Sequence, residues 1–169
     1  MTRGQLRIYL GAAAGVGTTY AMLDEGERRA GRGTHVAVGW VDTHSRPRTA
    51  EKLTQLLGGR PAPDALDTDS ILEEHPNVVL VDDLHRSTGP GPDARQHWQE
   101  VERLLEAGVN VVATLTVQHI ASLADTVDHI LERTDEHAPD RGLVPDAFLA
   151  RAEQIEIVDM TPEAIRRRI

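Results

Sequence analysis

The sequence contains no cysteine, a single lysine and very few aromatic residues. Without cysteine, the chain can form neither disulfides nor thiolate metal sites, and with no export signal at its N-terminus this favours a cytoplasmic protein. Two Trp, two Tyr and one Phe are too few for an aromatic platform that stacks nucleic-acid bases. The net charge of −9 also argues against a nucleic-acid partner, because phosphates attract clustered Lys and Arg.

Long apolar runs are also missing. No stretch approaches the roughly 18 apolar residues that a membrane-spanning helix requires, so direct membrane insertion is not expected. The chain has 169 residues, of which 40% are hydrophobic, and this is typical of one soluble domain spanning residues 1–169. The eight histidines are scattered without the spacing of metal ligands, so no histidine metal site is expected.

Short apolar runs alternate with longer helical patterns along the chain. We expect strands at Leu6–Leu10, His35–Val41, Asn77–Asp83, Asn110–Leu115 and Ile155–Met160, and helices at Thr18–Ala30, Arg48–Leu57, Ser70–Glu74, Gln96–Ala107, Gln118–Leu131, Asp146–Ala152 and from Thr161 onward. This alternation predicts an α/β, P-loop NTPase-like fold, with a mainly parallel sheet and helices on both faces. The first four strands should be neighbours in one sheet. Ligands bind such sheets at the C-terminal ends of the strands.

The stretch GAAAGVGTTYAML, from Gly11 to Leu23, has the form of a phosphate-binding loop with one residue exchanged. Such loops read Gly or Ala, four variable residues, Gly, Lys, and then Ser or Thr. Here Gly15 and Gly17 allow the tight turn that points backbone N–H groups at an anion. Thr18 occupies the position of the lysine. The candidate phosphate-binding residues are Ala12, Ala14, Gly15, Val16, Gly17, Thr18 and Thr19.

The missing lysine is a feature of this position. Of the 18 basic residues, 17 are arginine and only Lys52 is lysine. A general drift from Lys to Arg would have left arginine at position 18, whereas Thr18 is neutral. Since a charge-assisted contact contributes about 1.5–3 kcal/mol, its loss predicts roughly 10- to 150-fold weaker ATP binding.

Polar residues follow two further expected strands. Asp82 comes directly after four apolar residues and would hold Mg²⁺ together with the hydroxyl of Thr19 if a nucleotide binds. Asp83 stands at the catalytic position, where many ATPases place a Glu that orients the attacking water. Thr116 follows the fourth strand, where a polar side chain can sense the terminal phosphate. Arg86 is a candidate to replace the lysine charge, as is Arg95.

Several of these segments resemble the N-terminal sensor domain of the KdpD sensor histidine kinases. The segments are LGAAAGVGTTYAML (10–23), GWVDTHSRP (39–47), LVDDL (80–84), WQEVERLLEAGVNVVATLTVQHIASLAD (98–125) and VPDAFLARAEQIEIVDMTPE (144–163). The family pattern has Pro at position 14, Lys at 18, Glu at 83 and Asn at 116, where this chain has Ala14, Thr18, Asp83 and Thr116. The resemblance implies a cytoplasmic P-loop domain that binds ATP and regulates a kinase in two-component signalling.

Three functions remain open at this stage. The first, which the departures from the family pattern favour, is a regulatory domain with a protein partner from two-component signalling or potassium transport, and with weak or no ATP hydrolysis. The second is a working switch that binds ATP and Mg²⁺, in which an arginine replaces the lysine. The third is a binding module for another phosphorylated ligand, such as a nucleotide second messenger.

Overall fold

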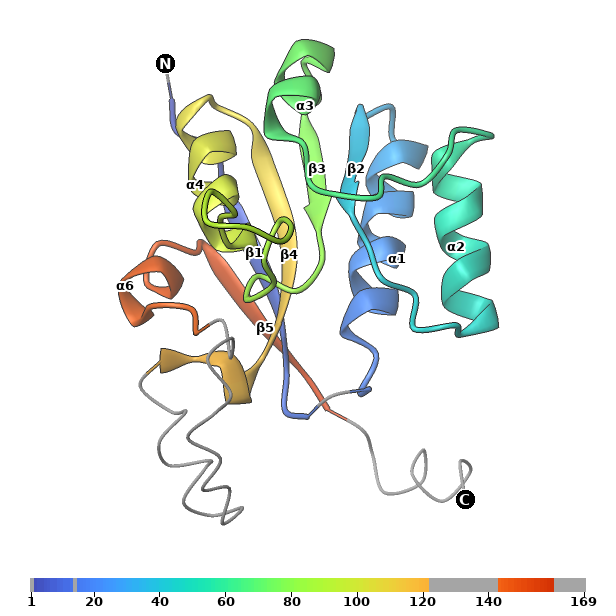
Figure 1. Cartoon of the computed structure of the whole chain (residues 1–169). Coiled ribbons are helices and arrows are strands. Elements are labelled where there is room, and N and C mark those ends of the chain that lie inside the picture. Colours follow the sequence, from blue (N-terminus) through green and yellow to red (C-terminus); the bar gives the residue numbers. More distant parts are fainter. Residues whose placement is uncertain (1, 14, 122–142, 160–169) are drawn as a thin grey trace.

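In the computed structural model, the described residues are 2–13, 15–121 and 143–159, and they form an α/β fold with one five-stranded parallel sheet (Figure 1). The strands are β1 (Leu6–Gly11), β2 (Val36–Trp40), β3 (Val78–Val81), β4 (Asn110–Thr116) and β5 (Gln154–Val158). Their order across the sheet is β2-β3-β4-β1-β5, and every neighbouring pair is parallel. The expected adjacency of the first four strands and the P-loop NTPase-like fold class are therefore confirmed.

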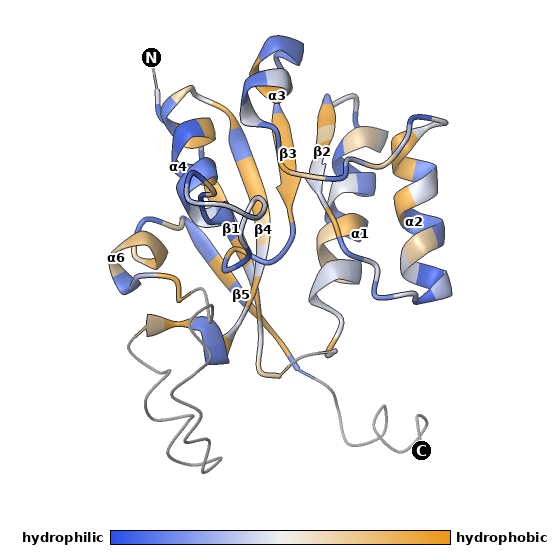
Figure 2. Cartoon of the chain, in the orientation of Figure 1, coloured by the Kyte–Doolittle hydropathy of each residue, from blue (hydrophilic) through white to orange (hydrophobic). Residues whose placement is uncertain are grey.

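Helices cover both faces of the sheet, as the alternating pattern predicts. The helices are α1 (Thr18–Gly31), α2 (Pro47–Leu57), α3 (Thr68–Glu74), α4 (His97–Glu106) and α6 (Asp146–Leu149). Figure 1 shows α1 and α2 on one side of the sheet and α4 and α6 on the other. Two separate hydrophobic clusters fill the two interfaces. Figure 2 shows the corresponding apolar central strands between helices that each carry apolar and polar residues.

The interior strand β3 has no exposed face. All four of its residues, Val78–Val81, are at most 2% exposed. A strand that is buried on both sides reads as a continuous apolar run, which is why the sequence signals it so clearly. Because its residues alternate between the two hydrophobic clusters, β3 anchors the residues that follow it on both faces of the sheet.

Helix α1 lies close to the sheet because it carries a glycine at the contact. A Cβ atom added at Gly26 would lie 2.6 Å from Cδ1 of Leu80 on β3. Glycine is unfavourable in a helix interior, by about 1 kcal/mol relative to alanine. Here the close approach of the helix to the strand accounts for its presence.

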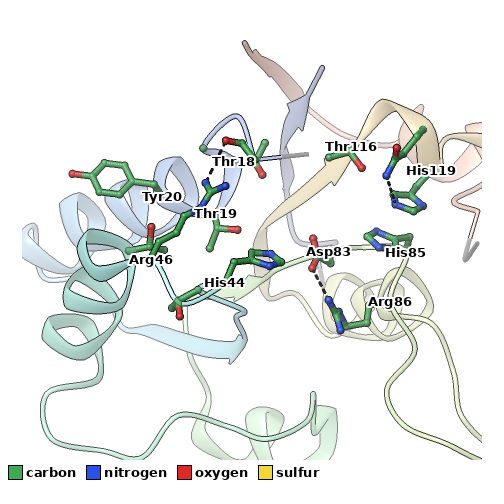
Figure 3. Close-up of a pocket in the computed structure, with 15 residues that line it drawn as sticks. Thr18, Thr19, Tyr20, His44, Arg46, Asp83, His85, Arg86, Thr116 and His119 are labelled. Atoms are coloured by element: carbon green, nitrogen blue, oxygen red, sulfur yellow. Dashed lines mark hydrogen bonds and ion pairs between the residues drawn. The ribbon is translucent and has the colours of Figure 1, made fainter. Parts of the chain in front are cut away.

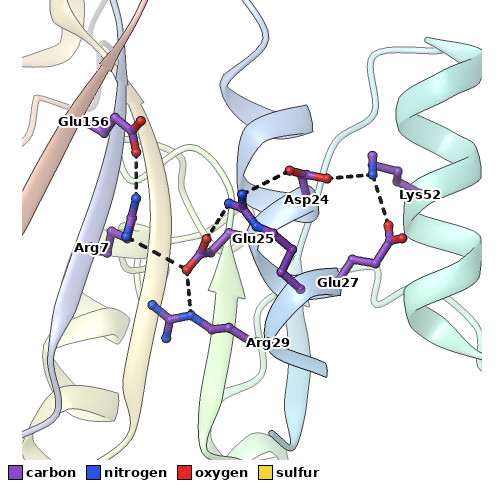
Figure 4. Close-up of polar contacts among 8 residues, drawn as sticks. Arg7, Asp24, Glu25, Glu27, Arg29, Lys52 and Glu156 are labelled. Atoms are coloured by element: carbon purple, nitrogen blue, oxygen red, sulfur yellow. Dashed lines mark hydrogen bonds and ion pairs between the residues drawn. The ribbon is translucent and has the colours of Figure 1, made fainter. Parts of the chain in front are cut away.

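Ion pairs connect α1 to its neighbours on either side (Figure 4). Glu25 is only 7% exposed and bonds to Arg28 at 2.6 Å and Arg29 at 2.9 Å. These partners lower the pKa of the Glu25 carboxyl even though burial acts in the opposite direction. Arg7 on β1 lies 4.0 Å from Glu25 and 2.7 Å from Glu156 on β5. The cluster therefore links α1 to two strands of the sheet.

The single lysine belongs to this structural network. The ammonium group of Lys52 on α2 donates to Asp24 at 2.9 Å and to Glu27 at 3.1 Å, both on α1. These two carboxylates raise the pKa of Lys52. Its charge is thus committed to the contact between α1 and α2.

Three expected elements differ from the structure. β3 ends at Val81 instead of Asp83, because Asp83 adopts a left-handed φ of 52° that cannot continue a strand. The helix expected from Gln118 does not begin there: residues Val117–His119 form a 3₁₀ turn, and Ile120 makes a β-bridge with Val144. The helix Asp146–Ala152 is shorter and ends at Leu149. The remainder of the Gln118–Leu131 helix and the helix from Thr161 fall outside the described residues.

Candidate functional site

A pocket of about 430 Å³ lies at the C-terminal edge of the sheet. Four segments that are distant in the sequence meet there (Figure 3). They are the loop between β1 and α1, the loop between β2 and α2, the residues after β3, and the end of β4. The described residues that line the pocket are Gly15, Gly17, Thr18, Thr19, Tyr20, Thr43, His44, Arg46, Thr49, Asp83, His85, Arg86, Thr116, Gln118 and His119.

The loop before α1 has the backbone that its glycines predict. Gly15 and Gly17 have φ values of 82° and 104°, which non-glycine residues rarely adopt. Gly17 is the N-cap of α1, so the first N–H groups of the helix face the pocket. Ala12 donates its N–H to Val158 of β5 at 3.2 Å, which fixes the start of the loop against the sheet.

The predicted site residues of this loop are partly brought together. Gly15, Gly17, Thr18 and Thr19 line the pocket, whereas Ala12 and Val16 are absent from its described lining. Ala14, which was also predicted to bind phosphate, lies outside the described residues.

Thr19 lines the pocket, whereas Asp82 is not part of the described lining and lies fully buried against Thr19. The Thr19 hydroxyl lies 3.0 Å and 2.9 Å from the two carboxylate oxygens of Asp82, and it can donate to either. Asp82 also accepts a bond from the backbone N–H of Asp42 at 3.1 Å and one from the hydroxyl of Thr114 on β4. The two predicted metal ligands are therefore in contact, although they are 63 positions apart in the sequence, and their binding of Mg²⁺ stays a prediction.

The Asp82 carboxyl is completely buried. Burial raises its pKa to about 7, and the nearby Asp83 adds to the shift, while the bonds from Thr114, Asp42 and Thr19 oppose it. At neutral pH the group is therefore poised between its neutral and charged forms.

Asp83 and Arg86 both reach the pocket, but they contact each other. A guanidinium nitrogen of Arg86 lies 3.3 Å from the Asp83 carboxylate and 3.5 Å from that of Asp42. The same guanidinium stacks over Trp40 at 4.6 Å from the ring centroid. The predicted water-orienting carboxylate is therefore paired with a cation. Arg95, the other arginine proposed to replace the lysine, does not line the pocket.

Strand β4 lies between β3 and β1 in the sheet, and a residue near its C-terminal end contacts the residues after β3. Thr114 bonds to Asp82 and also accepts the backbone N–H of Asp83 at 2.8 Å. Thr116, the predicted phosphate sensor, lies two residues after Thr114 on β4 and lines the pocket. Thr114 was missed in the sequence because it lies within the apolar run Asn110–Leu115.

Two stacked histidines close one side of the pocket. The rings of His85 and His119 are 3.5 Å apart between centroids and almost parallel. Burial lowers the pKa of His85 to about 3, and the adjacent His119 contributes in the same direction. Within the described part of the chain, no group of three or more His, Asp or Glu residues could hold a metal ion. The lowered pKa means that the His85 ring is neutral at physiological pH.

Several lining residues were not predicted from the sequence, and Arg46 is the arginine among them. It follows β2 in the loop Ser45-Arg46-Pro47, and its guanidinium donates to the carbonyl of Gly15 at 3.3 Å (Figure 3). The signal was available, because the residues after every strand of a parallel sheet are candidates for the ligand site. Arg86 and Arg95, the two arginines predicted to replace the lysine charge, both lie in the loop after β3.

Comparisons with known proteins show the family of this chain. Residues 2–169 match the family described as "KdpD: Osmosensitive K+ channel His kinase sensor domain". The chain belongs to the KdpD sensor-domain family. It is 43% identical to the sensor protein KdpD of Mycobacterium tuberculosis over 178 residues and 38% identical to that of Escherichia coli over 176 residues. A KdpD of Clostridium acetobutylicum is 34% identical over 175 residues.

These alignments cover 98–99% of this chain but only 19–20% of the relatives. The chain thus spans about a fifth of the length of these curated KdpD proteins. The match is to the sensor domain of a sensor kinase. In the described ranges, no helix is both long enough and apolar enough to cross a membrane.

Proposed function

We propose that this KdpD sensor domain is a cytoplasmic regulatory module that binds a nucleoside triphosphate with Mg²⁺ weakly and hydrolyses it slowly or not at all. The observation that carries the proposal is the pairing of Thr19 with Asp82 at 2.9–3.0 Å beneath a glycine loop at a helix N-terminus. A bare turn between a strand and a helix needs no buried carboxylate at that point.

The donor set fits a hard divalent cation. Mg²⁺ prefers oxygen ligands, and Thr19 and Asp82 supply a hydroxyl and a carboxylate. Bound there, directly or through water, the ion would neutralise phosphate charge. A cation would also favour the charged form of Asp82, which burial alone disfavours.

Weak hydrolysis follows from the surroundings of Asp83. Its carboxylate faces Arg86 at 3.3 Å, and a carboxylate held in an ion pair is less free to bind and orient a water molecule. Thr18 offers no positive charge to a phosphate in the transition state. We infer that occupancy of the pocket is the signal, and that it is passed to a protein partner in two-component signalling or potassium transport.

A second candidate ligand is another phosphorylated molecule, such as a nucleotide second messenger. The feature in its favour is the polar, uncharged lining at Thr43, Thr49 and Thr116. These hydroxyls suit a ribose or a base edge as well as a third phosphate.

Calorimetry tests the proposal. Titrating the chain with ATP–Mg²⁺, ADP, AMP and cyclic dinucleotides should give a dissociation constant for ATP–Mg²⁺ that is roughly 10- to 150-fold above that of lysine-containing loops. A phosphate-release assay should show no turnover above background. Turnover at a rate typical of P-loop enzymes, abolished by Asp82→Asn, would refute the regulatory assignment. Tighter binding of a cyclic dinucleotide than of ATP would favour the second candidate.

A further inference from the structure

Arg46 lies directly against the phosphate-binding loop. One guanidinium nitrogen donates to the Gly15 carbonyl at 3.3 Å. A Cβ atom at Gly15 would lie 2.8 Å from the other terminal nitrogen, so the guanidinium packs directly against the backbone of this loop. In Figure 3 the Arg46 side chain reaches from the loop before α2 toward the start of α1.

Within the described ranges, no carboxylate pairs with the charge of Arg46. Among the described residues, Arg46 makes no ion pair, whereas Arg86 faces Asp83 and Asp42. Lys52 is held by two carboxylates between α1 and α2 and does not line the pocket. In the described lining, Arg46 is therefore the arginine that can bind an anion without first breaking an ion pair with a carboxylate.

The backbone holds Arg46 in this place. His44 and Ser45, just before it, adopt left-handed φ values of 51° and 58°, which are costly for residues other than glycine. Asp42 accepts the backbone N–H of His44 at 2.9 Å, and Arg46 donates its own N–H to Thr43 at 3.0 Å. Arg46 is the N-cap of α2, and Pro47 occupies the first turn. The left-handed backbone of His44 and Ser45 thus turns the chain so that Arg46 lies beside the pocket.

We propose that Arg46 supplies the phosphate-binding charge that Thr18 cannot. When a nucleotide enters, the guanidinium leaves the Gly15 carbonyl and bonds to oxygens of the outer phosphates. Since guanidinium pairs with phosphate in a bidentate manner, the contact favours ligands with an exposed terminal phosphate. It also links the bound phosphate to the first turn of α2. This inference rests on the proposed function, because it concerns the same pocket.

The test compares three variants by calorimetry with ATP–Mg²⁺. Arg46→Gln retains a side-chain N–H donor for the Gly15 carbonyl but removes the charge, and it should weaken ATP binding roughly 10- to 100-fold. Arg46→Lys should recover part of the loss. Arg48→Gln is the matched control, because Arg48 is an exposed arginine two residues further along that does not line the pocket. The affinity of the Arg48→Gln variant for ATP–Mg²⁺ should equal that of the wild type.

A double variant tests whether the two positions share one role. Adding Thr18→Lys to Arg46→Gln should restore ATP binding, and the gain should exceed the gain from Thr18→Lys alone. AMP binding should change little in any of these proteins.

The outcomes separate the two proposals. If the wild type binds ATP and Arg46→Gln binds it as well as Arg48→Gln does, the role of Arg46 is wrong and the proposed function stands. If the wild type binds none of the nucleotides tested, both proposals fail. Circular dichroism and the thermal midpoint of each variant establish that the fold is intact.

Discussion

At the scale of single residues, Asp82 has the most unusual environment in the site. It is fully buried, accepts bonds from two hydroxyls and one backbone N–H, and stands beside a second aspartate. A buried charged carboxylate is unfavourable in the ligand-free protein at neutral pH, whereas a bound cation would stabilise its charge. The stability of the ligand-free chain should therefore depend on the protonation of this carboxyl.

We expect Asp82→Asn to stabilise the ligand-free protein increasingly as the pH rises. The folded pKa of Asp82, about 7, is above the value of roughly 3.9 in an unfolded chain, so the folded state binds this proton more tightly. Its contribution to stability is present at low pH and is lost as the pH rises from about 4 through about 7. Asparagine does not ionise, so the Asp82→Asn variant should not lose this stability as the pH rises.

The measurement is the thermal midpoint at pH 5 and at pH 8 without nucleotide or divalent cation. The midpoint of Asp82→Asn relative to the wild type should increase between these values, on the order of 5 °C. Asp93→Asn, at an exposed loop residue, should shift the midpoint by a similar amount at both pH values. A constant difference for Asp82→Asn would show that the carboxyl is charged throughout.

At the scale of elements, the contact of α1 with the sheet positions the loop that precedes it. Gly26 brings the helix close to Leu80 on β3, and the Glu25 cluster connects it to β1 and β5. Because Thr19 lies in the first turn of α1 and Asp82 follows β3, this packing also sets the distance between them. Displacement of the helix would disturb the contact between Thr19 and Asp82.

Gly26→Ala should therefore destabilise the protein even though alanine is the better helix former. The added methyl group overlaps Cδ1 of Leu80 at 2.6 Å, and overpacking of this kind costs about 1–3 kcal/mol. Gly31→Ala at the end of the same helix meets no atom within 4 Å and should be neutral or slightly stabilising. Chemical denaturation of both variants provides the comparison. Equal stability of the two variants would mean that the contact with β3 adapts without cost.

The elements were predictable from the sequence where one signal dominated. The buried strand β3 and helix α4, with its Gln96–Gln99 capping box, were found within two residues of their observed bounds. The end of β3 was missed because the left-handed φ of Asp83 depends on tertiary contacts with Thr114 and Arg86. The turn at Val117–His119 was missed for a similar reason, since the bridge from Ile120 to Val144 crosses more than twenty positions.

At the scale of the whole molecule, the pocket exists because the parallel sheet brings four strand ends to one edge. The sequence was sufficient to place Thr19, Asp83 and Thr116 in the lining, because each lies near the C-terminal end of an expected strand, and to place Asp82 next to them. It could not reveal that Arg86 pairs with two carboxylates while Arg46 faces the loop. Those contacts depend on the path of the loop after β2, which two residues with positive φ determine.

The central claim is that this edge retains a phosphate site that lacks the charge at position 18. The direct measurement is the calorimetric affinity of ATP–Mg²⁺ for the wild type, Thr18→Lys and Thr18→Ala. Thr18→Lys should bind roughly tenfold more tightly or better, with a smaller gain for AMP, because the loop lysine reaches the β- and γ-phosphates. Thr18→Ala should match the wild type. An unchanged affinity in a folded Thr18→Lys protein would contradict the claim and leave the loop as a structural turn.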